Sequence, residues 1–298
     1  GDALGAARGA RGPRLDRRRR GRAEPGNQAQ SALPVQNDYA SMERVHGRRA
    51  AQQAEQMCAR FAEVWAGTTV HSLRGVLTPV KLHAQALMQL TAKGTGDPTA
   101  ISELARKISD RIGFVERVLD DMRVFAQPVA ATARRERLSE VVAEACATVA
   151  DFFRAQRRDA SPVALAISVP DDLTIELARH QIVVALTNVL KNAHEAFADG
   201  SDRFCRGSII VTASVDGGAV KLIVEDTGPG LAAEDLRELQ EFVPGRTTKK
   251  NHGTGYGLPI ARRYVLAHQG RFSIDSQSGV GTTVTITLPL EREEVDEV

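Results

Sequence analysis

Residues 186–196 read L-T-N-V-L-K-N-A-H-E-A. This stretch lies within 179–198, where apolar residues recur at helical spacing, so we expect a helix there. Asn188 and Asn192 are four residues apart and therefore share one helix face. Amide oxygens on one face can bind a hard cation. Two asparagines on a helix are also ordinary surface residues, so the stretch predicts a site only together with others.

Two glycine-containing segments follow it. E-D-T-G-P-G, residues 225–230, comes at the end of a predicted strand, and its glycines let the backbone turn sharply. The Asp226 carboxylate there could accept a hydrogen bond from the exocyclic amine of adenine, where guanine presents a carbonyl. G-T-G-Y-G-L-P-I, residues 253–260, opens a helix, and amides at a helix N-terminus bind phosphate. Neither segment is specific alone, and the second lacks the G-K-[ST] of a P-loop.

The surrounding pattern predicts an α/β layered domain over 138–291, with helices on one face of a sheet. In the last strand, Val284, Ile286 and Leu288 alternate with threonines and should face inward. A linker over 129–137 precedes the domain, and an acidic tail, 292–298, follows it. We expect helices at 138–150, 179–198 and 258–268, and strands at 162–169, 173–177, 208–215, 220–225, 271–276 and 282–288.

Residues 41–128 read as two long helices joined by a short break at 93–98. The first has an apolar stripe at helical spacing, and the second has another that ends at Pro128. A two-helix hairpin cannot bury both stripes well, whereas two copies can form a four-helix bundle. We therefore expect a dimerisation hairpin. The first stripe consists of Phe61, Trp65, Leu73, Leu77, Val80, Ala84 and Leu87.

His71 lies on the first of these helices, in T-T-V-H-S-L-R-G-V-L-T-P-V, residues 68–80. At 100° per residue it is about 200° from Leu73, so it should point away from the stripe and into solvent. That position fits a reactive group awaiting a partner. It fits an idle surface histidine equally well.

Charge and composition restrict the remaining function classes. Residues 1–50 hold eleven arginines and five acidic residues, in a chain whose net charge is +2, so 1–40 is expected to be a basic, disordered linker. Few aromatic residues accompany these arginines, which argues against specific nucleic-acid recognition. The three scattered cysteines indicate a reducing cytoplasm. No apolar run approaches the roughly 18 residues of a membrane span, so membrane attachment would require segments absent from this chain.

Taken in order, the motifs resemble those of the sensor histidine kinases of bacterial two-component systems, over roughly residues 55–290. The asparagine helix is similar to their N box, D-T-G-P-G to the G1 box and G-T-G-Y-G-L to the G2 box. F-V-P-G-R-T-T-K, residues 242–249, is similar to the F box, often F-x-P-F-F-T-T-K. The resemblance implies an α+β fold, in which a hairpin dimerising into a four-helix bundle precedes an α/β sandwich of Bergerat (GHKL) type.

The resemblance also implies roles for these residues. Asp226 would read adenine, Asn192 would bind Mg²⁺, and Asn188 would assist near the phosphates. Related gyrase-like ATPases carry a glutamate at the position of Asn188; an amide cannot take a proton, so hydrolysis is disfavoured and transfer to a side chain is preferred. A mobile ATP lid is expected over 231–256. The further candidate ATP contacts are Gly228, Gly230, Arg246, Thr247, Thr248, Lys249, Gly253, Thr254, Gly255, Tyr256, Gly257 and Leu258.

The segment around His71 resembles the phosphoacceptor box H-E-[IL]-[RK]-N-P-L-T-P-[IL]. This likeness makes His71 the phosphoacceptor and adds Arg74 to the candidate catalytic residues. Three positions depart from the pattern: Ser72 replaces the acid, Gly75 the asparagine and Val76 the proline. In the family the acid assists proton removal from the imidazole. The polar residue four positions after the histidine, where this chain has Gly75, orients water during dephosphorylation.

Two functions follow as expectations. In the first, a homodimeric histidine kinase uses ATP and Mg²⁺ to phosphorylate His71 and passes the phosphoryl group to an aspartate of a response regulator receiver domain. In the second, a degenerate relative binds ATP and serves as a dimeric scaffold or phosphotransfer module with little autokinase activity. An ATP-hydrolysing machine is disfavoured by Asn188. The first two differ in whether ATP labels His71.

Overall fold

The computed structural model describes residues 42, 44, 46–92, 97–127, 129, 132–156, 158–198, 205–247 and 253–291. The contacts divide the chain into two units, between Ala59 and Arg60. The expected basic linker, 1–40, and acidic tail, 292–298, lie outside the described residues. The expected domain boundaries stay predictions.

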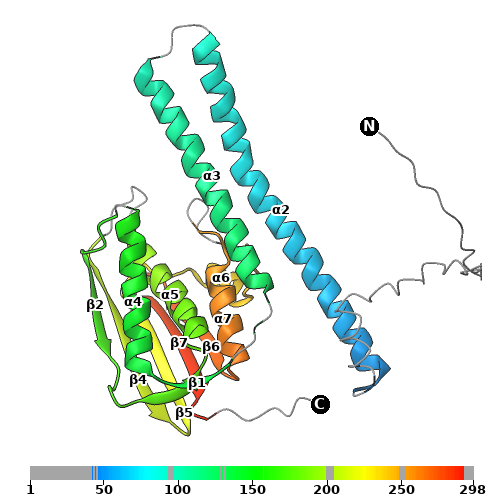
Figure 1. The fold of residues 1–298 in the computed structure, drawn as a ribbon, viewed down its shortest axis with the longest axis vertical. Coiled ribbons are helices and arrows are strands. Elements are labelled where there is room, and N and C mark those ends of the chain that lie inside the picture. The colour runs from blue at the N-terminus through cyan, green and yellow to red at the C-terminus, as the bar shows by residue number, and fades with distance from the viewer. Residues whose placement is uncertain are drawn as a thin grey trace, which may run out of the picture. The chain divides into compact units, whose positions relative to one another are not determined.

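Two long helices form the expected hairpin: α2, Arg48–Ala92, and α3, Pro98–Ala126 (Figure 1). The start of α3 has clear local causes. Asp97 is its N-cap and accepts a hydrogen bond from the Thr99 amide at 3.2 Å, and Pro98 occupies the first turn, where its missing N–H costs nothing.

Buried and partly buried positions on α2 recur by threes and fours through Thr69, Leu73, Val76 and Val80, which is the spacing of a helix packed on a neighbour. Leu73 and Trp65 pack against the cluster that contains Val118 of α3. Within this chain two members of the expected stripe are exposed: Leu77 by 52% and Phe61 by 48%. Apolar residues of α2 therefore follow two lines around the helix, of which one is buried within the chain.

A mixed sheet with helices on one face follows the hairpin (Figure 1). Its five strands have the order β2-β4-β5-β7-β6; β2 pairs with β4 in parallel, and the other pairs are antiparallel. The strands of this sheet are β2 (Val163–Ser168), β4 (Gly207–Asp216), β5 (Ala219–Asp226), β6 (Arg271–Gln277) and β7 (Gly281–Pro289). The helices of this region are α4 (Leu138–Ala155), α5 (Arg179–Glu195), α6 (Ala233–Gln240) and α7 (Gly257–Ala267).

The core lies between this sheet and the helices α4, α5 and α7. Val211, Val224 and Val284 are direct partners on neighbouring strands, so they share one face, and all three are buried. The threonines that alternate with Val284 are partly exposed. The expected α/β layered domain is confirmed.

Two elements were not expected. β1, Arg134–Arg137, lies where a linker was predicted and pairs antiparallel with β3, Thr174–Leu177. α6 lies inside the predicted lid and anchors it, since Leu236 and Leu239 pack on the core. The first half of the expected lid, 231–256, is therefore held by apolar packing. Over the described part of the chain, no helix is apolar enough over sufficient length to span a bilayer.

Candidate nucleotide site

A cavity of about 770 Å³ opens between α5, α7, the sheet and the lower end of the hairpin. Of the sequence-predicted residues, those that line it are Asn188, Asn192, Asp226, Gly230, Arg246, Thr247, Gly253, Thr254, Gly255, Gly257 and Leu258. Residues separated by up to 70 positions in sequence thus meet in one place. Thr248 and Lys249 lie outside the described residues.

The polar end of the cavity is built on two helices. Asn188 and Asn192 project from successive turns of α5, and α7 begins at Gly257 beside them. A Cβ at Gly257 would stand 3.4 Å from Asn188 Oδ1, which is a tight contact. Gly255 has φ +76°, and its Cβ would stand 2.6 Å from the backbone of Gly245, so only glycine allows the lid to approach here. Free amides at the start of α7 and the two side-chain amides make this end suited to phosphate.

The other end has an apolar floor and one carboxylate. Val224, Ile274 and Val284 line it from three neighbouring strands. Asp226 stands where β5 ends and is half-buried, and its Oδ1 accepts a hydrogen bond from the Gly228 amide at 2.9 Å. Gly228 itself is buried behind Asp226 and is not among the lining residues. A flat apolar surface beside a fixed carboxylate matches the chemistry of an adenine ring.

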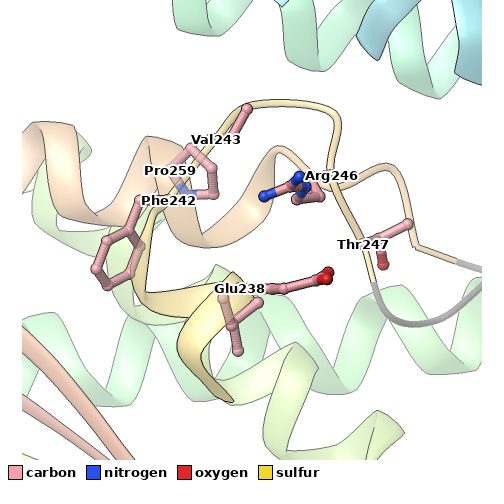
Figure 2. Close-up of a pocket in the computed structure, with 7 residues that line it drawn as sticks. Glu238, Phe242, Val243, Arg246, Thr247 and Pro259 are labelled. Carbon is pink, nitrogen blue, oxygen red and sulfur yellow. The ribbon is translucent and has the colours of Figure 1, made fainter. Parts of the chain in front are cut away.

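The base of the lid is fixed by aromatic packing. Phe242 has φ +52°, an uncommon conformation for a bulky residue, and its ring packs edge-on against Phe272 with centroids 5.5 Å apart. Figure 2 shows that side chains of α6, the loop after it and Pro259 of α7 surround a small hollow there. Arg246 and Thr247 line both this hollow and the large cavity, and Arg246 forms an ion pair with Glu241.

Helix α3 contributes residues that sequence reasoning missed. Arg117, Asp120 and Asp121 line the cavity from the hairpin side. Thr254 of the lid donates a hydrogen bond to Asp121 Oδ2 at 2.5 Å. Burial raises the pKa of the Asp121 carboxyl above its ordinary value, although this hydrogen bond acts in the opposite direction. A carboxylate on the hairpin therefore holds the lid at the edge of the cavity.

Lys191 is another lining residue that sequence reasoning missed. Its ammonium lies 3.8 Å from the centroid of the Phe152 ring, and both residues line the cavity. Burial lowers the pKa of the Lys191 amine. A signal for Lys191 was present, since it is three residues after Asn188 and residues at that spacing are neighbours on a helix surface. No local pattern could have indicated Asp121, because its position depends on how the hairpin packs.

Tyr256 is fully buried and contacts the hairpin instead of lining the cavity. Trp65 Nε1 donates a hydrogen bond to the Tyr256 hydroxyl at 3.0 Å, and the Thr69 hydroxyl lies 2.9 Å from the same oxygen. Nearby, the Thr68 hydroxyl donates to the Pro244 carbonyl at 3.1 Å. The loop that carries the lid is thus attached to α2 within one turn of His71.

His71 is exposed, as expected, and neither His71 nor Arg74 lines the cavity. Gly75 and Val76 differ in environment: the position of a Cβ at Gly75 is open, whereas Val76 is buried. Nothing is described of the Ser72 side chain. The structure therefore gathers most of the predicted nucleotide-binding residues and leaves the predicted acceptor outside the cavity.

The donor set fits a magnesium–phosphate complex better than a dedicated metal site. Among the described residues no three His, Cys, Asp or Glu side chains are placed to hold a metal ion. Asn192 offers one amide oxygen next to the phosphate-binding end. Mg²⁺ commonly takes one or two protein oxygens together with substrate phosphates, so the residues present fit that mode.

Comparison with known proteins agrees with this geometry. Residues 177–292 match the family described as histidine kinase-, DNA gyrase B- and HSP90-like ATPase. The chain is 28% identical over 226 residues to sporulation kinase E of Bacillus subtilis, covering 74% of this chain and 28% of the relative. It is also 28% identical over 226 residues to the sensor histidine kinase ZraS of Escherichia coli K12, covering 76% of this chain and 45% of the relative.

Among solved structures, the histidine kinase ThkA in complex with the response regulator protein TrrA has a TM-score of 0.59 and 20% identity, covering 86% of this chain and 68% of that one. This likeness concerns the fold. The chain spans less than half the length of the two curated relatives above. Residues 177–292 form an ATPase domain of the matched family, and the curated relatives that the chain resembles are sensor kinases.

Proposed function

We propose that this chain is the kinase core of a two-component sensor, which transfers the γ-phosphoryl group of ATP to His71 and then to an aspartate of a response regulator. The observation that carries the proposal is the cavity that unites the two asparagines of α5, Asp226 and the glycine segments on one domain, preceded by a hairpin with an exposed histidine. The likeness to sensor kinases supports kinase chemistry for this chain, and His71 as the acceptor is part of the proposal.

Asp226 would select adenine. Its carboxylate stands at the edge of the apolar floor, where the exocyclic amine of adenine could donate to it. Guanine would place a carbonyl oxygen against that carboxylate, and this contact between two acceptors would cost about 1–3 kcal/mol relative to the hydrogen bond with adenine. ATP should therefore bind much more tightly than GTP, and Asp226→Asn should weaken ATP binding. Equal affinities for ATP and GTP by calorimetry would contradict this assignment.

In the phosphoryl transfer, a ring nitrogen of His71 would attack the γ-phosphorus with its lone pair. The bond between that phosphorus and the bridging oxygen breaks, ADP leaves, and the imidazole N–H proton is lost. Mg²⁺ bound at Asn192 would neutralise charge on the phosphates. Asn188 supports transfer over hydrolysis because its amide cannot act as a base for water. The aspartate of the regulator then takes the phosphoryl group from His71.

The described arrangement has the lid attached to the hairpin through Tyr256 and Thr254, while His71 faces solvent outside the cavity. For transfer within one chain, the ATPase domain must leave these contacts and approach His71. In a dimer, the nucleotide of one subunit could instead reach the histidine of the other. Transfer within one chain therefore requires that the contacts of Tyr256 with α2 can break while the domain stays folded.

The decisive experiment is incubation with γ-labelled ATP and Mg²⁺, with His71→Gln as the matched variant. We expect label on the wild type that is lost in acid and kept in alkali, as for a phosphoramidate, and no label on His71→Gln. Persistent label on His71→Gln would show another acceptor and overturn the assignment.

A scaffold with little autokinase activity is the second candidate, and the departures at Ser72, Gly75 and Val76 favour it. In that case the chain would bind ATP at the same cavity and would form the same hairpin, but no label would appear on His71. Calorimetry with ATP and the labelling assay together separate the two functions.

A further inference from the structure

Lys191 has an environment that the proposed reaction does not yet use. It lies between the two asparagines in sequence and faces the same cavity. Its ammonium stacks on the Phe152 ring at 3.8 Å. Among the described residues no carboxylate lies within ion-pair distance of it, although Glu195 and Asp121 act on it electrostatically.

A cation that is largely removed from water and lacks an ion-pair partner is unfavourable unless an anion is supplied. The face of an aromatic ring compensates in part. A bound anion could neutralise the charge of Lys191 fully. The cavity can hold one there, because the amide donors of its phosphate-binding end lie next to Lys191 on the same helix. A nucleotide phosphate bound there would lie beside Lys191 Nζ and satisfy it with a charge-assisted hydrogen bond.

Asp121 is a negatively charged residue that lines the same cavity as Lys191. It lies on α3, acts on Lys191 electrostatically and accepts the hydrogen bond of Thr254. A phosphate that arrives at Lys191 brings negative charge toward the Asp121 carboxylate, and like charges in a partly desolvated cavity repel. The nucleotide and Asp121 therefore compete for the same cation.

We propose that Lys191 is a phosphate ligand of the bound nucleotide, with selectivity for the triphosphate, and that the negative charge of Asp121 opposes phosphate binding at Lys191. The proposal rests on the proposed function, because it uses the same ATP cavity. It adds a residue of this chain outside the two-asparagine pattern, and it links nucleotide binding to the hairpin residue that holds Thr254.

The test is calorimetric titration of the full chain with Mg²⁺–ATP and Mg²⁺–ADP. Lys191→Met keeps the length and the apolar contact with Phe152 but removes the charge. We expect it to weaken ATP binding about tenfold, equivalent to about 1.4 kcal/mol, and ADP binding less than about threefold. Lys191→Arg should keep most of the ATP selectivity, because it keeps the positive charge.

Asp121→Asn is the matched variant on the hairpin side, since its amide oxygen can still accept the Thr254 hydrogen bond. It should strengthen ATP binding about threefold or more when Lys191 is present, because the competing charge is gone, and have a much smaller effect in combination with Lys191→Met. Unchanged affinities for both nucleotides in Lys191→Met would overturn the proposal, as would equal losses for both, which indicate a structural role.

The same titrations separate this proposal from the proposed function. Asp226→Asn should weaken ATP and ADP by similar factors, since both carry adenine. If the wild type binds ATP and Asp226→Asn does not, the assignment of the nucleotide site is supported, and this conclusion does not depend on the result for Lys191→Met. Failure of the wild type to bind either nucleotide would overturn both proposals.

Discussion

At the scale of the residue, the identity of residue 72, directly after His71, should determine how fast ATP labels His71. Ser72 stands where the family carries an acid, and a positioned general acid or base typically contributes about 10²–10⁴-fold. A neutral imidazole already offers a lone pair, so the wild type should react slowly. Ser72→Glu should raise the initial rate of label incorporation from ATP at least tenfold, without changing ATP affinity.

Ser72→Ala is the control for this prediction and should label at nearly the wild-type rate. If the wild type already labels as fast as Ser72→Glu, another group supplies the base. If neither protein is labelled although both bind ATP, the scaffold function applies.

A second residue-scale prediction concerns the buried His194 on α5. Burial lowers the pKa of its imidazole, while its Nδ1 lies 2.9 Å from the Leu190 carbonyl. The unfolded chain therefore binds a proton at higher pH than the folded one does. The resulting stability is fully present above the ordinary pKa of about 6.5 and is lost as pH falls through the lowered folded value.

Chemical denaturation at pH 8 and pH 5.5, with His194→Leu beside the wild type, measures this contribution. The wild type should lose more free energy of unfolding between these pH values than His194→Leu, which has no imidazole at this position. Equal losses in the two proteins would mean that His194 titrates alike in the folded and unfolded states.

At the scale of the element, Gly75 is a weak point in α2. It lies in mid-helix, four residues from His71, and a Cβ there meets no atom within 4 Å. Because glycine costs about 1 kcal/mol relative to alanine in a helix interior, Gly75→Ala should raise the free energy of unfolding by about 0.5–1 kcal/mol.

Gly67→Ala is the matched control, since Gly67 also lies in α2 with open space at its Cβ position. Thermal unfolding should show a similar gain for both variants. If labelling of His71 slows only in Gly75→Ala, the flexibility of α2 at this point serves the transfer. A loss of stability in Gly75→Ala would contradict the helical geometry at Gly75.

Elements with their own periodicity could be predicted, and elements that depend on a partner could not. α5 and β7 have clear apolar patterns, and both were expected within a few residues. β1 has the sequence R-R-E-R, which favours no strand, and it exists because β3 offers it a pairing edge. α6 did carry a signal, with Glu234 and Asp235 in its first turn and an arginine in its last, which complement the helix dipole.

The residues of the candidate site can likewise be divided into those that local sequence predicts and those that depend on packing between distant segments. Its asparagine, aspartate and glycine residues lie in local motifs whose order indicates a nucleotide site. The contributions of Asp121 and Tyr256 arise where the hairpin packs on the lid, and no local motif describes that packing. Sequence therefore indicated the nucleotide residues but not the contacts through which the hairpin can respond to them.

At the scale of the whole molecule, the hairpin exposes a second apolar line. Val70 and Leu77 on α2 are each 52% exposed, and Ile112 and Leu119 on α3 are 47% and 50% exposed. The members of each pair are seven residues apart, so each pair follows one face of its helix. Isolated apolar residues on a surface are ordinary, but two heptad-spaced pairs on neighbouring helices indicate an interface with a second copy.

We predict that this line is the dimer interface. Full burial of a leucine or isoleucine contributes about 1.5–3 kcal/mol relative to exposure, and a two-fold dimer would bury each of these side chains twice. Leu77→Glu with Leu119→Glu should therefore give monomers by light scattering at micromolar concentration, while ATP affinity is unchanged, because neither residue lines the cavity. Gln89→Glu, an exposed charge change on α2, should remain dimeric. A monomeric wild type would exclude the dimer, whereas a dimeric double variant would place the interface on another face of the hairpin.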